Sequence, residues 1–176
     1  MTRIFTVGHS THPIKEFAGI LDAHGVTQVV DIRTIPKSRH NPQFGEDAMA
    51  KSLPTFGIGY RRLSALGGLR HTTAESVNMG WRNTSFRGYA DYMQTDAFTH
   101  GIDELLTLAD ERSVAIMCAE AVPWRCHRSL VGDALLVRGI EVSDIFSATS
   151  AKPHTLTRFA SVDGLSITYP PTPEPV

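Results

Sequence analysis

Side chains capable of chemistry are concentrated in one segment of the chain, Cys118–Arg128. It holds two thiols, a carboxylate, an imidazole and two guanidiniums, and it directly follows the largely apolar run Ser113–Met117. That run is too short for a helix of its own and is typical of an inner β-strand. We therefore expect the polar segment in a turn between a strand and a helix, where backbone N–H groups and the helix dipole favour anion binding and thiol activation.

The helix after this turn is expected to begin at Pro123 and to end at Gly139, because proline is favoured in the first turn and glycine just past the last. Apolar side chains at Cys126, Leu130 and Ala134 recur at helical spacing. This spacing favours a packing role for Cys126, although a position at a helix N-terminus would lower the pKa of its thiol if exposed.

Cys118 and Glu120 are the first candidate catalytic residues. Cys118 could act as a nucleophile or a metal ligand, and the alternative is a small buried apolar residue. Glu120 follows a buried strand, so its carboxylate must be solvated, paired or used. We consider it a general acid–base, with a structural ion pair to Arg125 or Arg128 as the alternative.

Other polar residues follow three further predicted strands, Ile4–Val7, Thr27–Ile32 and Ile58–Leu63. Helical patterns starting at Pro13 and near Glu46 separate these strands, which indicates a parallel sheet. Ligands bind at the carboxyl ends of the strands in such a sheet. The residues expected to meet Cys118 and Glu120 at that edge are Gly8, His9, Ser10, Asp31, Arg33, Arg61 and Arg62.

Several of these residues have a functional and an ordinary interpretation. His9 and His127 are candidate proton carriers, and each could instead satisfy a local hydrogen bond. Asp31 and Arg33 could bind a ligand or pair with neighbours. Gly8 and Ser10 are assigned to ligand binding, with a helix cap as the alternative role of Ser10.

The net charge of −1 conceals a basic middle segment, 33–88. Nine basic residues against three acidic ones give this segment a net charge of +6. It could steer a phosphate-bearing ligand or nucleic acid, with Arg33, Arg39 and Arg128 binding anionic groups. The alternative is a solvated basic surface.

The stretch Ser64–Arg87 is rich in Gly, Ser, Thr, Asn and Arg and is expected to be a long loop. Loops of this length in compact domains are often lids or binding loops. Trp81, Phe86 and Tyr89 could stack on nucleic-acid bases. Two helices are expected to follow, around Gly88–Gln94 and over Phe98–Glu111.

Short motifs succeed one another along the chain in a characteristic order: Gly8-His9-Ser10, Asp31-Ile32-Arg33, Arg39–Phe44, Leu66-Gly67-Gly68, Tyr89–Met93, Cys118-Ala119-Glu120 and Cys126-His127-Arg128. In this combination, from about Thr6 to Phe146, the chain resembles the bacterial and archaeal domain of unknown function 488 family. The resemblance implies that these polar positions belong to a family pattern. As the family's name says, it implies no assigned activity.

The length of 176 residues, with 41% hydrophobic and 20% charged residues, suits one domain with a full core. We expect a single α/β domain over 1–168, with a mostly parallel sheet flanked by helices on both faces in a Rossmann-like three-layer arrangement. A small hairpin around Asp163-Gly164 and a Pro-rich tail, 169–176, are expected at the end of the chain.

No signal peptide and no apolar run of roughly 18 residues is found, so we expect a cytoplasmic protein with no membrane partner. Two cysteines make no disulfide framework, and reduced thiols are expected. A reversible Cys118–Cys126 pair stays open. No cofactor and no oligomeric state is implied.

The functional expectation is an enzyme, a hydrolase or a transferase, acting on a phosphate-bearing ligand such as a nucleotide or nucleic acid. A cysteine phosphatase fits only in part and is not favoured, because six residues rather than five separate Cys118 from Arg125 and because Glu120 would repel phosphate. One alternative is a non-catalytic nucleotide-binding, nucleic-acid-binding or thiol redox-sensing protein. A second is a metal-binding hydrolase using Cys118, Cys126, His127 and His9, although thiols eight positions apart match no short-spaced zinc pattern, so no metal ligand is assigned.

Overall fold

The computed structural model describes residues 2–172 and contains a six-stranded sheet in the order β3-β2-β4-β1-β5-β6. Five parallel strands form where the sequence has short β-rich runs, and β6 pairs antiparallel with β5. The strands are β1 (Arg3–Gly8), β2 (Gln28–Asp31), β3 (Gly59–Arg62), β4 (Val114–Cys118), β5 (Glu141–Ser147) and β6 (Ser150–Pro153).

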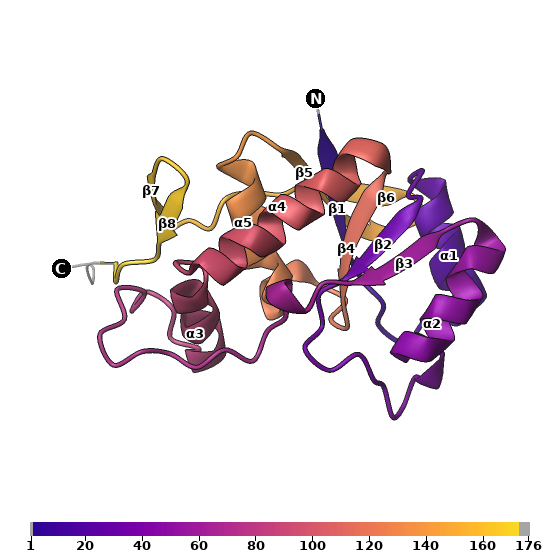
Figure 1. Cartoon of the computed structure of the whole chain (residues 1–176), viewed down its shortest axis with the longest axis horizontal. Helices are drawn as coiled ribbons and strands as arrows, with labels where there is room; N and C mark the ends of the chain where they lie inside the picture. The colour runs from indigo at the N-terminus through magenta and orange to yellow at the C-terminus, as the bar shows by residue number, and fades with distance from the viewer. Residues whose placement is uncertain (1, 173–176) are drawn as a thin grey trace.

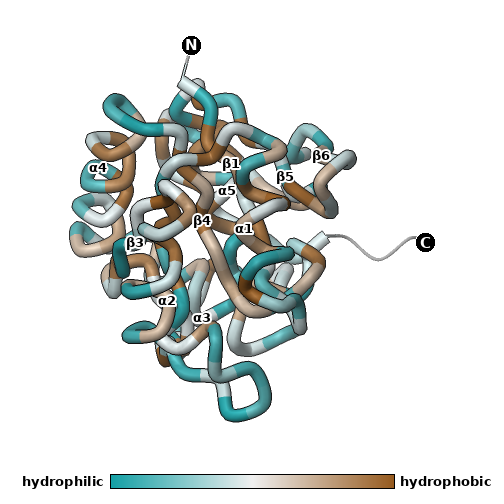
Figure 2. Tube along the Cα trace, turned by 90° about the vertical axis from the view of Figure 1, so that its right-hand side faces the viewer, coloured by the Kyte–Doolittle hydropathy of each residue, from teal (hydrophilic) through white to brown (hydrophobic). Residues whose placement is uncertain are grey.

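Helices cover both faces of this sheet, as the alternation of strands and helices predicts (Figure 1). The helices α1 (Ile14–Ala23) and α2 (Glu46–Ser52) pack on one face through a core that includes Phe5, Phe17 and Met49. The other face is covered by α3 (Thr84–Tyr92), α4 (Asp96–Glu111) and α5 (Arg128–Leu136). The expected three-layer α/β class is confirmed, and Figure 2 shows the hydrophobic segments gathered around β1 and β4.

The central strand β4 aligns the ends of its two neighbours. Gly8 of β1 lies opposite Cys118, and Asp31 of β2 lies opposite Met117. Backbone hydrogen bonds extend this pairing past the strand ends, because the amide of His9 donates to the Cys118 carbonyl at 2.9 Å. The segments after β1, β2 and β4 therefore meet at one edge of the sheet.

The turn after β4 differs from the expected helix start at Pro123. Pro123–Arg125 forms one 3₁₀ turn, and Cys126 then has an extended backbone with φ −138° and ψ 147°. A residue in that conformation cannot continue a helix, so α5 begins at Arg128. Cys126 therefore lies ahead of the helix and not on its apolar face.

The loop between β3 and α3 is shorter and more ordered than the sequence suggests. The side chain of Asn83 accepts hydrogen bonds from the amides of Ser85 and Phe86, and this cap starts α3 at Thr84 rather than near Gly88. Four loop residues also donate hydrogen bonds to the carboxylate of Asp91 on α3: Thr72, Thr73, Ser76 and Asn78.

The C-terminal segment folds back on the domain. Ser161–Asp163 (β7) and Ser166–Thr168 (β8) form the expected hairpin, with Gly164 in the left-handed region at φ 62°. Tyr169, the first residue of the expected tail, is buried, and its hydroxyl donates to Asp133 Oδ2 at 2.8 Å. The last four residues of that tail lie outside the described part of the chain. Within 2–172, no helix combines the length and apolar character needed to cross a membrane.

A buried ionic cluster ties this end of the chain to the sheet. His154 donates from Nε2 to Asp133 Oδ1 and from Nδ1 to Asp144 Oδ2, each at 3.0 Å. Burial alone would lower the pKa of His154, but the two carboxylates outweigh it and raise the pKa to about 9. The imidazole is therefore charged at neutral pH.

We predict that the protein loses stability in mildly alkaline solution. The folded state binds the His154 proton more tightly than the unfolded chain, whose histidine pKa is about 6.5. This contribution, about 3 kcal/mol, is fully present below pH 6.5 and is lost as the pH rises through about 9. Urea unfolding between pH 6 and 10 measures it, and His154→Gln should flatten the profile. NMR titration of the wild-type ring gives a direct check: a pKa near 6.5 would contradict the prediction.

Candidate functional site

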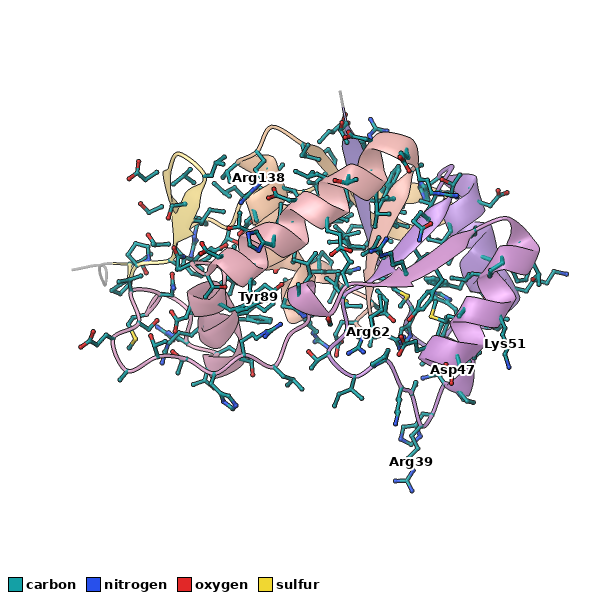
Figure 3. All side chains as sticks on the ribbon, viewed as in Figure 1. Arg39, Asp47, Lys51, Arg62, Tyr89 and Arg138 are labelled. Atoms are coloured by element: carbon teal, nitrogen blue, oxygen red, sulfur yellow. The ribbon has the colours of Figure 1, made fainter. Side chains whose placement is uncertain are left out.

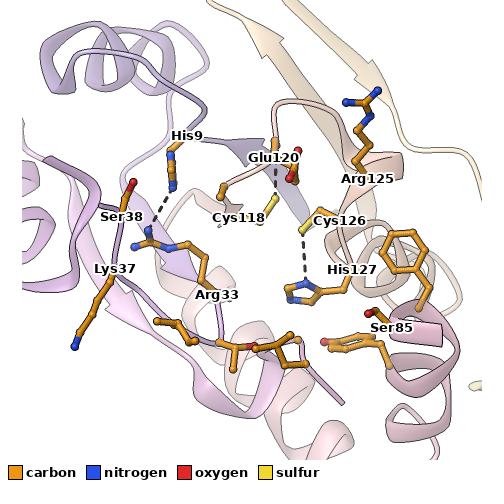
Figure 4. Close-up of a pocket in the computed structure, with 17 residues that line it drawn as sticks. His9, Arg33, Lys37, Ser38, Ser85, Cys118, Glu120, Arg125, Cys126 and His127 are labelled. Carbon is orange, nitrogen blue, oxygen red and sulfur yellow. Dashed lines mark hydrogen bonds between the residues drawn. The ribbon is translucent and has the colours of Figure 1, made fainter. Parts of the chain in front are cut away.

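A cavity of about 350 Å³ opens at the carboxyl edge of the sheet, and we call it the strand-end cavity (Figure 4). The turn after β4 forms one wall, the segment after β2 forms another, and the loop before α3 overhangs it. The lining residues are His9, Arg33, Thr34, Ile35, Lys37, Ser38, Gly68, Leu69, Ser85, Phe86, Tyr89, Cys118, Ala119, Glu120, Arg125, Cys126 and His127.

Five of the ten candidate residues that were predicted from the sequence are found together in the wall of this cavity. They are His9, Arg33, Cys118, Glu120 and His127, which come from the ends of three strands and from the residue before α5. Arg61 and Arg62, which were expected at the same edge, are not among the lining residues.

Gly8, Ser10 and Asp31 lie beside the cavity and shape it through the backbone and through buried contacts. A Cβ on Gly8 would lie 1.6 Å from the carbonyl oxygen of Glu120, so only glycine fits. Ser10 has an uncommon positive φ of 49°, and its amide donates to the Ala119 carbonyl. Asp31 is fully buried, and its carboxylate accepts hydrogen bonds from Arg33 and from the hydroxyl of Tyr60.

The two remaining candidates, Arg39 and Arg128, are not among the residues that line the cavity. Arg39 is exposed on the loop after β2 and projects away from the domain, so the structure does not bring it to the cavity (Figure 3). Arg128 is fully buried behind the turn that follows β4.

Arg33 is held by a nearly complete set of acceptors. Its Nε and Nη2 donate to the two oxygens of Asp31 at 2.9 and 2.7 Å, and Nη2 also donates to the Phe44 carbonyl. Nη1 donates to His9 Nε2 at 3.3 Å. Because Nη1 carries two hydrogens, one N–H of this fixed guanidinium remains for a ligand in the cavity.

His9 supports Arg33 and is not arranged as a proton carrier. Its Nδ1 donates to the Ser10 carbonyl at 2.8 Å, which leaves Nε2 as the acceptor for Arg33. The ring stacks on Phe44 with centroids 4.2 Å apart. Burial is the main cause that lowers the pKa of His9 to about 4, so the ring is neutral at pH 7.

His127 has its tautomer fixed by two carbonyls. Nε2 donates to the carbonyl oxygens of Ile32 and Leu66 at 2.9 and 3.1 Å, so Nδ1 carries a lone pair. That lone pair faces Cys126 Sγ at 3.6 Å. Burial lowers the pKa of His127 to about 4. A Cβ on Gly68 would come within 3.1 Å of Nδ1, so the Leu66-Gly67-Gly68 motif both binds this ring and leaves room for it.

The two thiols differ in their pKa values and therefore in their protonation states. Cys118 and Cys126 are 2% and 7% exposed. Burial raises the pKa of Cys118, but the Cys126 thiol and the charge of Arg128 together bring that pKa below its ordinary value. Interaction with Cys118, and then burial, raises the pKa of Cys126. Cys118 is therefore the thiol that ionises first, and Cys126 keeps its proton.

Arg128 has no carboxylate partner within residues 2–172. Nη2 donates to the Ala121 carbonyl at 3.3 Å, while Nε and Nη1 are buried without a hydrogen-bond acceptor. A buried cation needs an anion nearby. The ion pair to Glu120 that was considered from the sequence is not formed by Arg128 or by Arg125, and the Glu120 side chain is exposed.

The rim contains residues that the sequence did not single out. Lys37 contributed to the sequence analysis only through the net charge, and Arg125 only as a partner for Glu120; both line the cavity. Ile35 and Leu69, which are 60% and 68% exposed, also stand at this rim. Only the fold shows that these two apolar side chains fail to reach the core.

Most of the basic middle segment is already engaged in internal contacts. Besides Arg33, four of its arginines have partners within the domain: Arg61 pairs with Glu104, Arg62 donates to Thr34, Arg70 donates to Gly67 and Ser64, and Arg87 donates to Trp81. These contacts reduce the charge that is free to bind a nucleic-acid backbone.

The four residues considered for zinc do not form a metal site. Over 2–172, no three or more His, Cys, Asp or Glu side chains are grouped so that they could hold a metal ion. Nε2 of His9 accepts from a guanidinium, and Nε2 of His127 donates to two carbonyls.

Comparison with known proteins identifies a family. No curated protein and no solved structure matches the chain. One family model matches residues 13–135. This range begins after the Gly8-His9-Ser10 motif and ends before Phe146, so it is narrower than the resemblance over about 6–146. Since the matched residues make up more than half of the 176, the chain belongs to the family described as "Domain of unknown function DUF488".

Proposed function

We propose that this protein is an enzyme in which the thiolate of Cys118 attacks an anionic small molecule bound in the strand-end cavity. The observation that carries the proposal is the fully buried guanidinium of Arg128, whose Nε and Nη1 have no acceptor. A thiolate at Cys118 supplies the anion that this cation requires. The thiolate is also the nucleophilic form of cysteine.

The charges around the cavity favour an anionic substrate. Three cationic side chains line it, Arg33, Lys37 and Arg125, and Glu120 is the one acidic side chain among the described lining residues. The remaining N–H of Arg33 Nη1 offers a fixed donor, while Lys37 and Arg125 are exposed at the rim. A phosphate-bearing ligand, as the basic segment suggested, would bind through the same groups.

The volume of about 350 Å³ suits a small molecule. Glu120 stands at the mouth with no ion-pair partner in the described chain. We assign it the exchange of a proton with the leaving group or with water, since Nε2 of His9 faces Arg33 and Nδ1 of His127 faces Cys126.

The charge on Cys118 can be tested without knowledge of the substrate. We predict that the ultraviolet absorption of a thiolate persists below pH 8.5, the ordinary thiol pKa, and disappears in Cys118→Ser. Arg128→Met should move the midpoint upward because the stabilising cation is lost. Arg125→Gln, a change to an exposed arginine of the same turn, is the matched control and should move it much less. Thiolate absorption that is absent from the wild-type protein below pH 8.5 would refute the proposal, whether or not Arg128→Met folds.

The preference for anions can be tested by alkylation. Iodoacetate is negatively charged, whereas iodoacetamide is neutral. We expect the ratio of the iodoacetate rate to the iodoacetamide rate to be higher for Cys118 than for a free thiol in solution. Lys37→Gln combined with Arg125→Gln should lower this ratio several-fold, because it removes the two exposed cations of the rim. Lys51→Gln, which changes an exposed lysine of α2 outside the cavity (Figure 3), is the control. Peptide mapping measures both rates, and a ratio that Lys37 and Arg125 do not affect would argue against an anionic substrate.

A further inference from the structure

The base of this site faces the second thiol, not the nucleophile. The lone pair of His127 Nδ1 lies 3.6 Å from Cys126 Sγ, and the two carbonyls that bind Nε2 prevent the ring from turning toward Cys118. The amide of Arg128 donates to the same sulfur at 3.5 Å. Cys126 is thus held with an acceptor for its proton and a donor for its developing charge.

This arrangement suits a reaction at Cys126. In acyl or phosphoryl transfer the covalent adduct on Cys118 is removed by water or by an acceptor, and a proton acceptor on a neighbouring thiol contributes nothing. When the adduct is a sulfur atom, the neighbouring thiol can attack Cys118 and release it. The two thiols interact directly and line one cavity, so the second attack needs no large movement.

We propose that the substrate is an anionic sulfane-sulfur donor of the thiosulfate class and that Cys126 is the resolving thiol. This inference rests on the proposed role of Cys118 as the nucleophile. The cations Arg33, Lys37 and Arg125 would then stabilise the anion that leaves. A hydroperoxide, which also oxidises thiol pairs, is neutral and would not call for these cations.

The proposed reaction has two steps. The Cys118 thiolate attacks the outer sulfur of thiosulfate, a new S–S bond forms, and the S–S bond of the donor breaks with its electron pair leaving on sulfite. Cys126 then attacks Cys118 Sγ while its proton passes through His127 Nδ1 to the departing sulfur. The Cys118–Cys126 disulfide forms, and the transferred sulfur leaves as hydrosulfide with that proton. The two thiols supply the two electrons, and an external dithiol restores them.

The experiment uses the reduced full-length protein and thiosulfate, with no dithiol present. We expect intact-mass spectrometry to show loss of two hydrogens and release of one equivalent each of sulfite and sulfide. Cys126→Ser should stop after the first step, with release of sulfite and gain of one sulfur atom on Cys118. His127→Gln should slow sulfide release by roughly 100-fold, as loss of a general base does, while sulfite release keeps its rate. His40→Gln, which changes an exposed histidine outside the cavity, is the control.

The outcomes separate this inference from the proposed function. If thiolate absorption shows an ionised Cys118 but thiosulfate releases no sulfite, the sulfur-donor inference is wrong. The proposed role of Cys118 as the nucleophile is then unaffected. Faster disulfide formation with hydrogen peroxide than with thiosulfate would also overturn the substrate class. A hydrosulfide rate unaffected by Cys126→Ser would remove Cys126 from the reaction. If Cys118 has no thiolate absorption, both proposals fail.

Discussion

A guanidinium that is buried without a carboxylate partner is the constraint on which the rest of the site depends. Arg128 is fully shielded from solvent, and its Nε and Nη1 have no acceptor in the described chain. An uncompensated charge in such a place is costly, and the cheapest compensation is an anion on a neighbouring side chain. Of the two adjacent thiols, Cys118 is the one whose pKa is lowered, because the Cys126 thiol and Arg128 together outweigh its burial. The proposed nucleophile and its counter-ion are thus two parts of one interaction.

The backbone places this charge pair at the sheet edge. Glu120 can fold back over β1 because Gly8 has no side chain, and even a methyl group there would lie 1.6 Å from the Glu120 carbonyl. The amides of His9 and Ser10 then donate to the Cys118 and Ala119 carbonyls at 2.9 and 3.0 Å. These contacts make the turn after β4 an extension of the sheet rather than a free loop. The thiol and the guanidinium consequently keep their positions with little help from ionic contacts at the surface.

The sequence predicts which strand ends meet, because apolar runs and the rule for parallel sheets fix the edge at which His9, Arg33 and Cys118 lie. It does not predict the roles of these side chains, since roles depend on contacts between distant residues. His9 pairs with an arginine 24 positions away, and His127 donates to a carbonyl 95 positions away. The extended Cys126 and the outward-facing Arg39 were missed for a related reason. Helical spacing and net charge describe a segment on average, whereas one backbone conformation or one loop direction decides where a side chain points.

The charge states of the buried histidines follow from their partners rather than from burial alone. His154 lies between two carboxylates, which outweigh its burial and raise its pKa to about 9. His9 and His127 donate to carbonyls and face a guanidinium or a thiol, so burial prevails and lowers each pKa to about 4. A neutral imidazole can accept a proton from Cys126, whereas a charged one could not. The fold therefore holds one buried histidine as a cation beneath its C-terminal segment and two as neutral rings in its cavity. The carboxylates beside His154 account for this difference, and the neutral state of His127 is the one that the proposed proton transfer from Cys126 requires.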